Sequence, residues 1–225
     1  MRHALALLLV LVFPVLDIWA TRRLKRSTDP NKKIKSYLST MAVLWAASVL
    51  AWILDRPGLF YLLEVPNWGL SRGFVYGFAV PLLLVLVLPV FLARSLEKYR
   101  AMIQKSMARL SFFLPATSAE RWLFIAVSLT AAICEETLYR GYLFNYLVGD
   151  WRLAVVAALL LQAGAFGLGH CYQGVRGVVL TAFLGAWFAL IYLATGSLLL
   201  PMLCHAILDL RILLLPAPNL LTEEG

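Results

Sequence analysis

The sequence predicts an all-α fold: a bundle of about seven transmembrane helices with one amphipathic helix on the cytoplasmic surface. Of the 225 residues, 62% are hydrophobic and only 14% are charged, where an ordinary globular protein carries roughly a quarter charged residues. The mean hydropathy is +0.82. Apolar runs of about 17–26 residues lack the period-two alternation of a membrane barrel, so helices must satisfy the backbone in lipid.

The first apolar run ends in a basic cluster. Arg22, Arg23, Lys25 and Arg26 follow it at once, which is a stop-transfer pattern and indicates an anchor rather than a cleaved signal peptide. Proline at positions 14, 81 and 89 predicts local kinks within the spans. We expect the seven spans at about residues 4–20, 38–54, 74–93, 122–147, 153–170, 177–194 and 198–215.

The stretch 94–114 between the third and fourth spans is less apolar. Leu96, Tyr99, Ile103 and Met107 recur at helical spacing, and basic residues take the polar positions between them. This pattern predicts an amphipathic helix lying on the membrane surface.

Loop charge predicts the orientation. The loops 21–35 and 94–121 are strongly basic, whereas the intervening loop 55–73 is nearly balanced. Basic loops stay on the cytoplasmic side, which puts the N-terminus outside and the C-terminus in the cytoplasm. Topology and anionic lipid therefore account for the net charge of +8, and no nucleic-acid partner is expected.

The three cysteines do not form a pattern of their own. Cys134, Cys171 and Cys204 are odd in number and have no short spacing, so they predict neither a disulfide framework nor a zinc motif. Each adjoins a polar residue of interest, but small apolar helix residues are the favoured interpretation.

Ionisable residues gather in three predicted spans of the C-terminal half. Each one costs about 2.5–3.5 kcal/mol to insert into a bilayer, so each calls for a reason. Structural pairing between helices could explain one such cluster, but three together favour a functional site. The clusters are Glu135, Glu136 and Arg140 in the fourth span, His170 in the fifth, one helical turn after the apolar Phe166, and His205 and Asp209 in the seventh.

Helix geometry gives the members of these clusters different tasks. Glu136 and Arg140 are four residues apart and can form an ion pair on one helix face. Glu135 is rotated about 100° from Glu136, so it lacks that partner and can face a different cavity. His205 and Asp209 are also four apart, so the carboxylate can fix the imidazole tautomer or help to hold a water molecule. His3 is terminal and is expected to be incidental.

Hydrolysis of an amide bond inside a membrane needs these groups. A buried carboxylate can act as general base on a water molecule, and imidazoles can orient that water, donate to the oxyanion or protonate the leaving amine. Two histidines and a carboxylate could equally bind zinc with an open position, although no His-Glu-x-x-His motif is present.

At these residues the sequence resembles the CPBP family of CAAX proteases and bacteriocin-processing proteins, the Abi-like intramembrane peptidases that include the Ras-converting type. The family pattern is Glu-Glu-x-x-x-Arg, then Phe-x-x-x-His, then His-x-x-x-Asn or a related residue, and residues 118–215 carry all three parts in order. Asp209 stands where the Ras-converting branch has Asn. Residues 1–117 show no motif and form a predicted N-terminal region, and residues 216–225 form a predicted tail.

The resemblance implies an intramembrane endopeptidase in which Glu135 activates water with the help of His170. His205 and Asp209 would stabilise the oxyanion, and Glu136 with Arg140 would hold the helix. No metal is favoured; if a zinc ion takes part, Glu135, His170 and His205 would bind it. The substrate would be a membrane-anchored protein or peptide of the CAAX type, the bacteriocin type or a C-terminal sorting signal, cut at a bacterial inner membrane.

Two other functions fit the same residues. Buried Glu, His and Arg also make relays in proton- or cation-coupled transporters, but the sequence lacks the two similar halves with broken helices that many of them show. A catalytically idle immunity or scaffold protein would keep the residues as a framework.

The depth of His170 in the membrane poses a further question. His170 lies near the cytoplasmic end of its span and is predicted to lie shallower than Glu135, unless the fifth helix extends to about residue 175 or the fourth helix protrudes into the cytoplasm.

Overall fold

The structure is a computed structural model that describes residues 1–54 and 72–216, and within these ranges it contains helices and no strand. The predicted all-α class is confirmed for this part of the chain. The predicted loop 55–73 and tail 216–225 lie almost wholly outside it. The α-helices are α1 (Arg2–Leu7), α2 (Phe13–Arg26), α3 (Lys32–Leu54), α5 (Arg72–Ser95), α6 (Glu97–Ala108), α7 (Ser118–Glu136), α8 (Asn145–Gly149), α9 (Val155–Leu168), α10 (Gly174–Thr195) and α11 (Leu199–Leu210).

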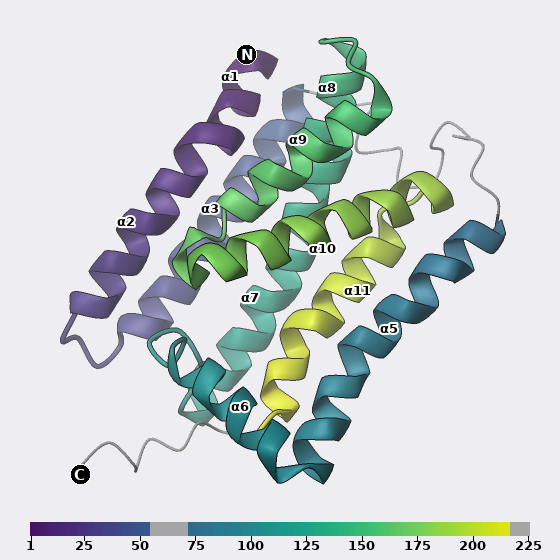
Figure 1. The fold of residues 1–225 in the computed structure, drawn as a ribbon. Coiled ribbons are helices and arrows are strands. Elements are labelled where there is room, and N and C mark those ends of the chain that lie inside the picture. Colours follow the sequence, from purple (N-terminus) through teal and green to yellow (C-terminus); the bar gives the residue numbers. More distant parts are fainter. Residues whose placement is uncertain (55–71, 217–225) are drawn as a thin grey trace.

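Each predicted span has a helical counterpart in this bundle (Figure 1). Four helical stretches of the described ranges are long and apolar enough to cross a membrane, and the protein is therefore an integral membrane protein. The fifth predicted span, α9, is a shorter apolar helix of 14 residues. The four candidate spans are Arg2–Arg26, Lys32–Leu54, Ser118–Gly149 and Cys171–Thr195.

Two of these spans change their winding along their length. The π-helical segment Leu8–Val12 joins α1 to α2 just before Pro14, whose ring would clash with the carbonyl group four residues earlier in a regular α-helix. A second π-helical segment, Thr137–Phe144, joins α7 to α8 and begins directly after Glu135 and Glu136. π-helical turns are frequent at functional sites, and this one adjoins the first predicted cluster.

The two basic loops lie side by side. Lys33 Nζ donates to the carbonyl oxygen of Leu114 at 2.6 Å, and Lys25 Nζ lies 4.5 Å from the centroid of the Phe112 ring. The α2–α3 connection, α6 and the C-terminal end of α11 face the same end of the bundle (Figure 1). The two basic loops therefore lie at the same end of the bundle, as their charge predicts. The cytoplasmic location of this end and the position of α6 on the membrane surface stay predictions.

The N-terminus is tied to the other end of the bundle. Tyr142 Oη donates to the carbonyl oxygen of Arg2 at 2.5 Å, and Arg2 pairs with Asp150 at 3.1 Å. The ring of His3 contacts Tyr146 through its Nδ1 atom. The interpretation of His3 as incidental is therefore wrong, because it helps to dock α1 on α8.

The helices α9 and α10 pack closely against each other. Gly167 of α9 faces Val178 and Ala182 of α10, and a Cβ atom built on Gly167 would lie 2.7 Å from the Val178 carbonyl oxygen. Small residues of this kind let membrane helices approach closely, which compensates for the missing hydrophobic driving force in lipid. The pair carries the turn that contains His170.

Replacing Gly167 with Ala is predicted to destabilise the protein by roughly 1–3 kcal/mol, because the added methyl group collides with α10 backbone. Gly164 lies one turn earlier in α9 and has no atom within 4 Å of an added Cβ. Gly164→Ala should leave stability unchanged or raise it by up to about 1 kcal/mol through helix propensity. Thermal unfolding of both purified variants in one detergent measures the difference; equal midpoints would contradict the close approach.

Candidate active site

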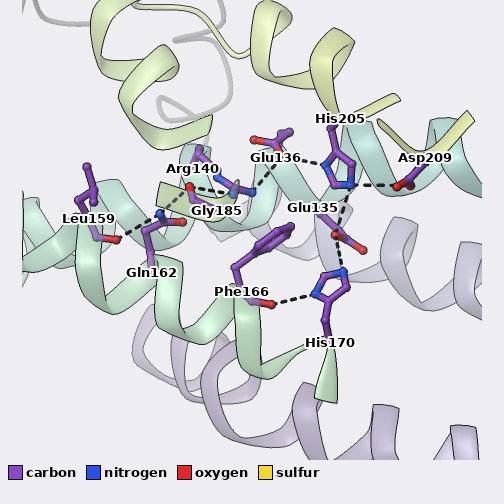
Figure 2. A network of polar contacts seen from close by, with 10 residues as sticks. All are labelled: Glu135, Glu136, Arg140, Leu159, Gln162, Phe166, His170, Gly185, His205 and Asp209. Atoms are coloured by element: carbon purple, nitrogen blue, oxygen red, sulfur yellow. Dashed lines mark hydrogen bonds and ion pairs between the residues drawn. The ribbon is translucent and has the colours of Figure 1, made fainter. Parts of the chain in front are cut away.

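The polar residues of the three clusters meet in one place (Figure 2). Glu135 and Glu136 end α7, His170 lies in the turn after α9, and His205 and Asp209 lie on α11. An extension of the fifth helix to about residue 175, one of two ways to bring His170 to the depth of Glu135, does not occur, because α9 ends at Leu168 and a 3-10 turn follows at Cys171–Gln173. His170 lies between the helix and this turn, with Nε2 3.9 Å from Glu135 Oε2.

Arg140 closes the inner end of the site. Its Nη1 atom pairs with Glu136 Oε1 at 2.9 Å, and both side chains are completely buried, as the spacing of four residues predicts. Its Nη2 atom donates to the carbonyl oxygen of Gly185 at 3.0 Å. The guanidinium carbon lies 4.2 Å from the centroid of the Phe166 ring, a cation–π contact in a desolvated setting.

Gly185 leaves the room that this arrangement needs. A Cβ atom at this position would lie 3.0 Å from Phe166 Cδ1 and 3.3 Å from Arg140 Nη2. Gln162 Nε2 also donates to the Gly185 carbonyl oxygen at 3.3 Å, so one backbone acceptor receives two buried side chains. The inner end is thus fixed by α9 and α10 as well as by α7.

Glu136 has a second partner that sequence spacing does not reveal. Its Oε1 atom lies 2.9 Å from His205 Nδ1, and because a carboxylate accepts, His205 carries its proton on Nδ1 in this contact. Asp209 lies on the other side of the ring, with Oδ2 3.8 Å from Nε2, beyond hydrogen-bond distance. The prediction that Asp209 fixes the tautomer is wrong; Glu136 does so, and the role of holding water remains open to Asp209.

Phe166 positions His170 through its backbone. His170 Nδ1 lies 2.9 Å from the Phe166 carbonyl oxygen, which can only accept, so the ring donates from Nδ1 and presents Nε2 to the cavity. The Phe166 ring packs against the His170 ring with centroids 4.9 Å apart. The Phe-x-x-x-His spacing is therefore one helical turn that aims an imidazole.

Glu135 lies between the two histidines. Its Oε2 atom is 3.9 Å from His170 Nε2 and 3.9 Å from His205 Nε2. That atom is buried and has no hydrogen-bond partner among the residues that the structure describes. A water oxygen about 2.8 Å from Glu135 and from either imidazole fits this spacing. The rotation of Glu135 away from the Glu136–Arg140 pair is as helix geometry predicts.

Exposure increases from one end of the site to the other. Glu136 and Arg140 are fully buried, the Glu135 and His170 side chains are 17% and 18% exposed, and Asp209 is 31% exposed. The Glu136–Arg140 ion pair therefore lies at the buried end of the site, and Asp209 lies at its more exposed end.

The donor atoms are spaced wider than a bound zinc ion requires. Metal bonds of about 2.0–2.1 Å place tetrahedral N and O ligands roughly 3.4 Å apart, whereas both Glu135–His distances are 3.9 Å. Across residues 1–54 and 72–216, no group of three or more His, Cys, Asp or Glu side chains is arranged to hold a metal ion. The free cysteines adjoin the site, with Cys134 and Cys204 buried and Cys171 partly exposed.

Three contributors were not predicted from the sequence. Gln162 is a polar residue in an apolar span, the same signal that marks the three clusters, and it could have been found. Gly185 contributes its backbone carbonyl group, which every residue has, so the residue type at this position does not reveal the contact. Phe188 stacks on the His205 ring at 5.6 Å and is indistinguishable in sequence from any apolar residue of α10.

Comparison with known protein families identifies the region that holds this site. Residues 117–211 match the family described as Rce1-like, type II CAAX prenyl endopeptidase Rce1-like. The match covers just under half of the chain and includes every residue of the three clusters. Searches among curated proteins and among solved structures gave no significant match.

Replacing Arg140 with Gln is predicted to destabilise the protein by about 3–5 kcal/mol, because it leaves the buried Glu136 carboxylate without its charge partner. Arg121→Gln is the matched control, since Arg121 is an exposed residue of the same helix. Combining Arg140→Gln with Glu136→Gln should cost less than the two changes added together, since no isolated charge then remains. Unfolding of the wild type, the two single variants, the double variant and the control in a titrated denaturing detergent gives the comparison; additive losses would contradict a coupled pair.

Proposed function

We propose that this protein, whose residues 117–211 are an Rce1-like type II CAAX prenyl endopeptidase domain, is an intramembrane endopeptidase in which Glu135 activates the attacking water. The family is a family of proteases, so a protein or peptide substrate follows. One observation carries the role of Glu135: a buried oxygen without a partner, 3.9 Å from the Nε2 atoms of two histidines.

The first step is the attack of water on the scissile carbonyl carbon. A water molecule between Glu135 Oε2 and His170 Nε2 donates one hydrogen to each acceptor, which leaves an oxygen lone pair free for the carbonyl carbon. The C–O bond forms as Glu135 takes the proton. His170 orients the water because the Phe166 carbonyl oxygen holds the proton on its Nδ1 atom.

The negative charge of the tetrahedral intermediate needs a donor. A proton on His205 Nε2 supplies it, and Glu136 and Asp209 on either side of the ring stabilise the positive imidazolium. An ionised Asp209 accepts and does not donate, so it acts on the oxyanion through His205. The Asn of the Ras-converting branch can donate directly, and this is where the two sites differ.

Collapse of the intermediate breaks the C–N bond. Glu135 returns its proton to the leaving amine, which yields a carboxylic acid and a free amine and restores the carboxylate. The pair Glu136–Arg140 takes no proton in this cycle and keeps the end of α7 fixed. We place zinc outside the favoured mechanism; if a zinc ion took part, Glu135, His170 and His205 would hold it, and its charge would make a bound water molecule more acidic.

The substrate enters from the Asp209 side of the site. We place this side toward the cytoplasm, with the N-terminus outside the cell, in a bacterial inner membrane. A membrane-anchored segment brings its scissile bond to that depth without leaving lipid, which suits CAAX-type, bacteriocin-type and sorting-signal substrates alike.

Glu135→Gln is predicted to lower cleavage roughly 10²–10⁴-fold, because the amide cannot accept the proton of water. The assay incubates purified protein in detergent with three probes: a prenylated CAAX peptide, a bacteriocin precursor and a peptide with a C-terminal sorting helix. Glu97→Gln, an exposed glutamate of α6, is the matched control and should cleave as the wild type does. A Glu135→Gln protein that retains full activity would refute the proposed base.

A chelator is predicted to leave the cleavage rate unchanged, because the proposed water is held by side chains alone. The test compares the wild type before and after dialysis against a strong chelator, with readdition of zinc. A loss that zinc restores would assign the water to a metal ion. Proton-driven flux into liposomes without cleavage of any probe would favour a transporter.

A further inference from the structure

An acidic residue of the N-terminal span lies next to the candidate site. Asp17 is the only ionisable residue in the apolar run 4–20. Its insertion into the bilayer carries the same free-energy cost as that of each ionisable residue in the three clusters. It lies on α2, outside the matched family region. Its Oδ2 atom is buried and finds no hydrogen-bond donor in the described parts of the chain.

Asp17 meets the turn that follows His170. The helix α2 packs against the 3-10 turn Cys171–Gln173, and the Asp17 carboxylate lies beside the backbone N–H of Tyr172, near enough to interact with it electrostatically. The first N–H groups of any helix lack partners within the helix, and in a membrane such a group is costly to leave unpaired. Asp17 therefore offers this turn a carboxylate acceptor from a distant part of the chain.

The same turn presents His170 to Glu135. His170 precedes the 3-10 turn, and its carbonyl oxygen accepts from the backbone N–H of Gln173 at 3.0 Å. The rings of His170 and Tyr172 lie 6.0 Å apart. A constraint on the Tyr172 backbone is thus a constraint on the position of His170. Asp17 and Glu135 also lie within electrostatic range of each other.

We infer that Asp17 is a positioning residue of the active site, which holds the turn His170–Gln173 through the backbone N–H of Tyr172 and so fixes His170 opposite Glu135. The consequence for catalysis rests on the proposed function, whereas the constraint on the turn does not. The N-terminal span then supports the chemistry of a domain to which it does not belong in sequence.

Hydrogen exchange of the segment 170–173, measured by mass spectrometry on protein in nanodiscs, tests the constraint without any substrate. Asp17→Ala should raise the exchange rate of this segment about tenfold, since the Tyr172 N–H loses its acceptor. Asp17→Asn keeps one oxygen acceptor and should exchange at nearly the wild-type rate. Leu16→Ala, an exposed neighbour on the same helix, is the matched control and should change nothing.

Kinetics with whichever probe the wild type cleaves supplies the second readout. Asp17→Ala should lower kcat about tenfold with KM within twofold, and Asp17→Asn should restore most of the rate. Unchanged exchange of the segment 170–173 in Asp17→Ala would overturn the inference, as would faster exchange spread evenly over α7 and α10. If no probe is cleaved by the wild type, the proposed function fails, while the exchange result still decides the role of Asp17.

Discussion

The site depends on one carboxylate oxygen. Glu136 Oε1 accepts from Arg140 on its own helix and from His205 on α11, at 2.9 Å in each case. A fully buried carboxylate is tolerated only when its charge is paired, and here the pairing also joins two helices and sets a tautomer. Arg140 extends the connection to the α10 backbone at Gly185. One ionic contact therefore fixes the relative positions of α7, α10 and α11.

This anchoring leaves the neighbouring glutamate unpaired. Because Arg140 pairs with Glu136, Glu135 has no cationic partner of this kind in the described part of the chain. It faces two imidazoles whose Nδ1 atoms are both hydrogen-bonded to other groups. Preorganised groups of this kind need little rearrangement when charge develops during a reaction, which is a large source of catalytic power. Two adjacent glutamates thus differ in their surroundings, because helix rotation places Glu136 in an ion pair and leaves Glu135 facing the two histidines; in the proposed mechanism the first is structural and the second reacts.

Much of the fold and of the site could be predicted from the sequence, because burial in lipid makes each ionisable residue informative. Apolar length predicted where helices occur, and the spacing Glu136–Arg140 predicted the ion pair. What spacing cannot give is contact between helices. The bond from Glu136 to His205 displaced Asp209 as the tautomer-setting residue, and the Gly185 carbonyl group left no trace in the sequence. The predicted end of the fifth span at residue 170 lies close to the observed end of α9 at Leu168, but the 3-10 turn that follows was not predicted.

The shortness of α9 has a consequence for the surrounding bilayer. Fourteen residues cover about 21 Å of helix, well short of the roughly 30 Å of hydrocarbon that a full crossing requires. Lipid beside such a short element thins locally, and headgroups with their hydration follow it inward. The turn that carries His170 follows this short helix directly. Under the proposed function, the attacking water would reach the Glu135 carboxylate from the side of the bilayer at which this turn lies.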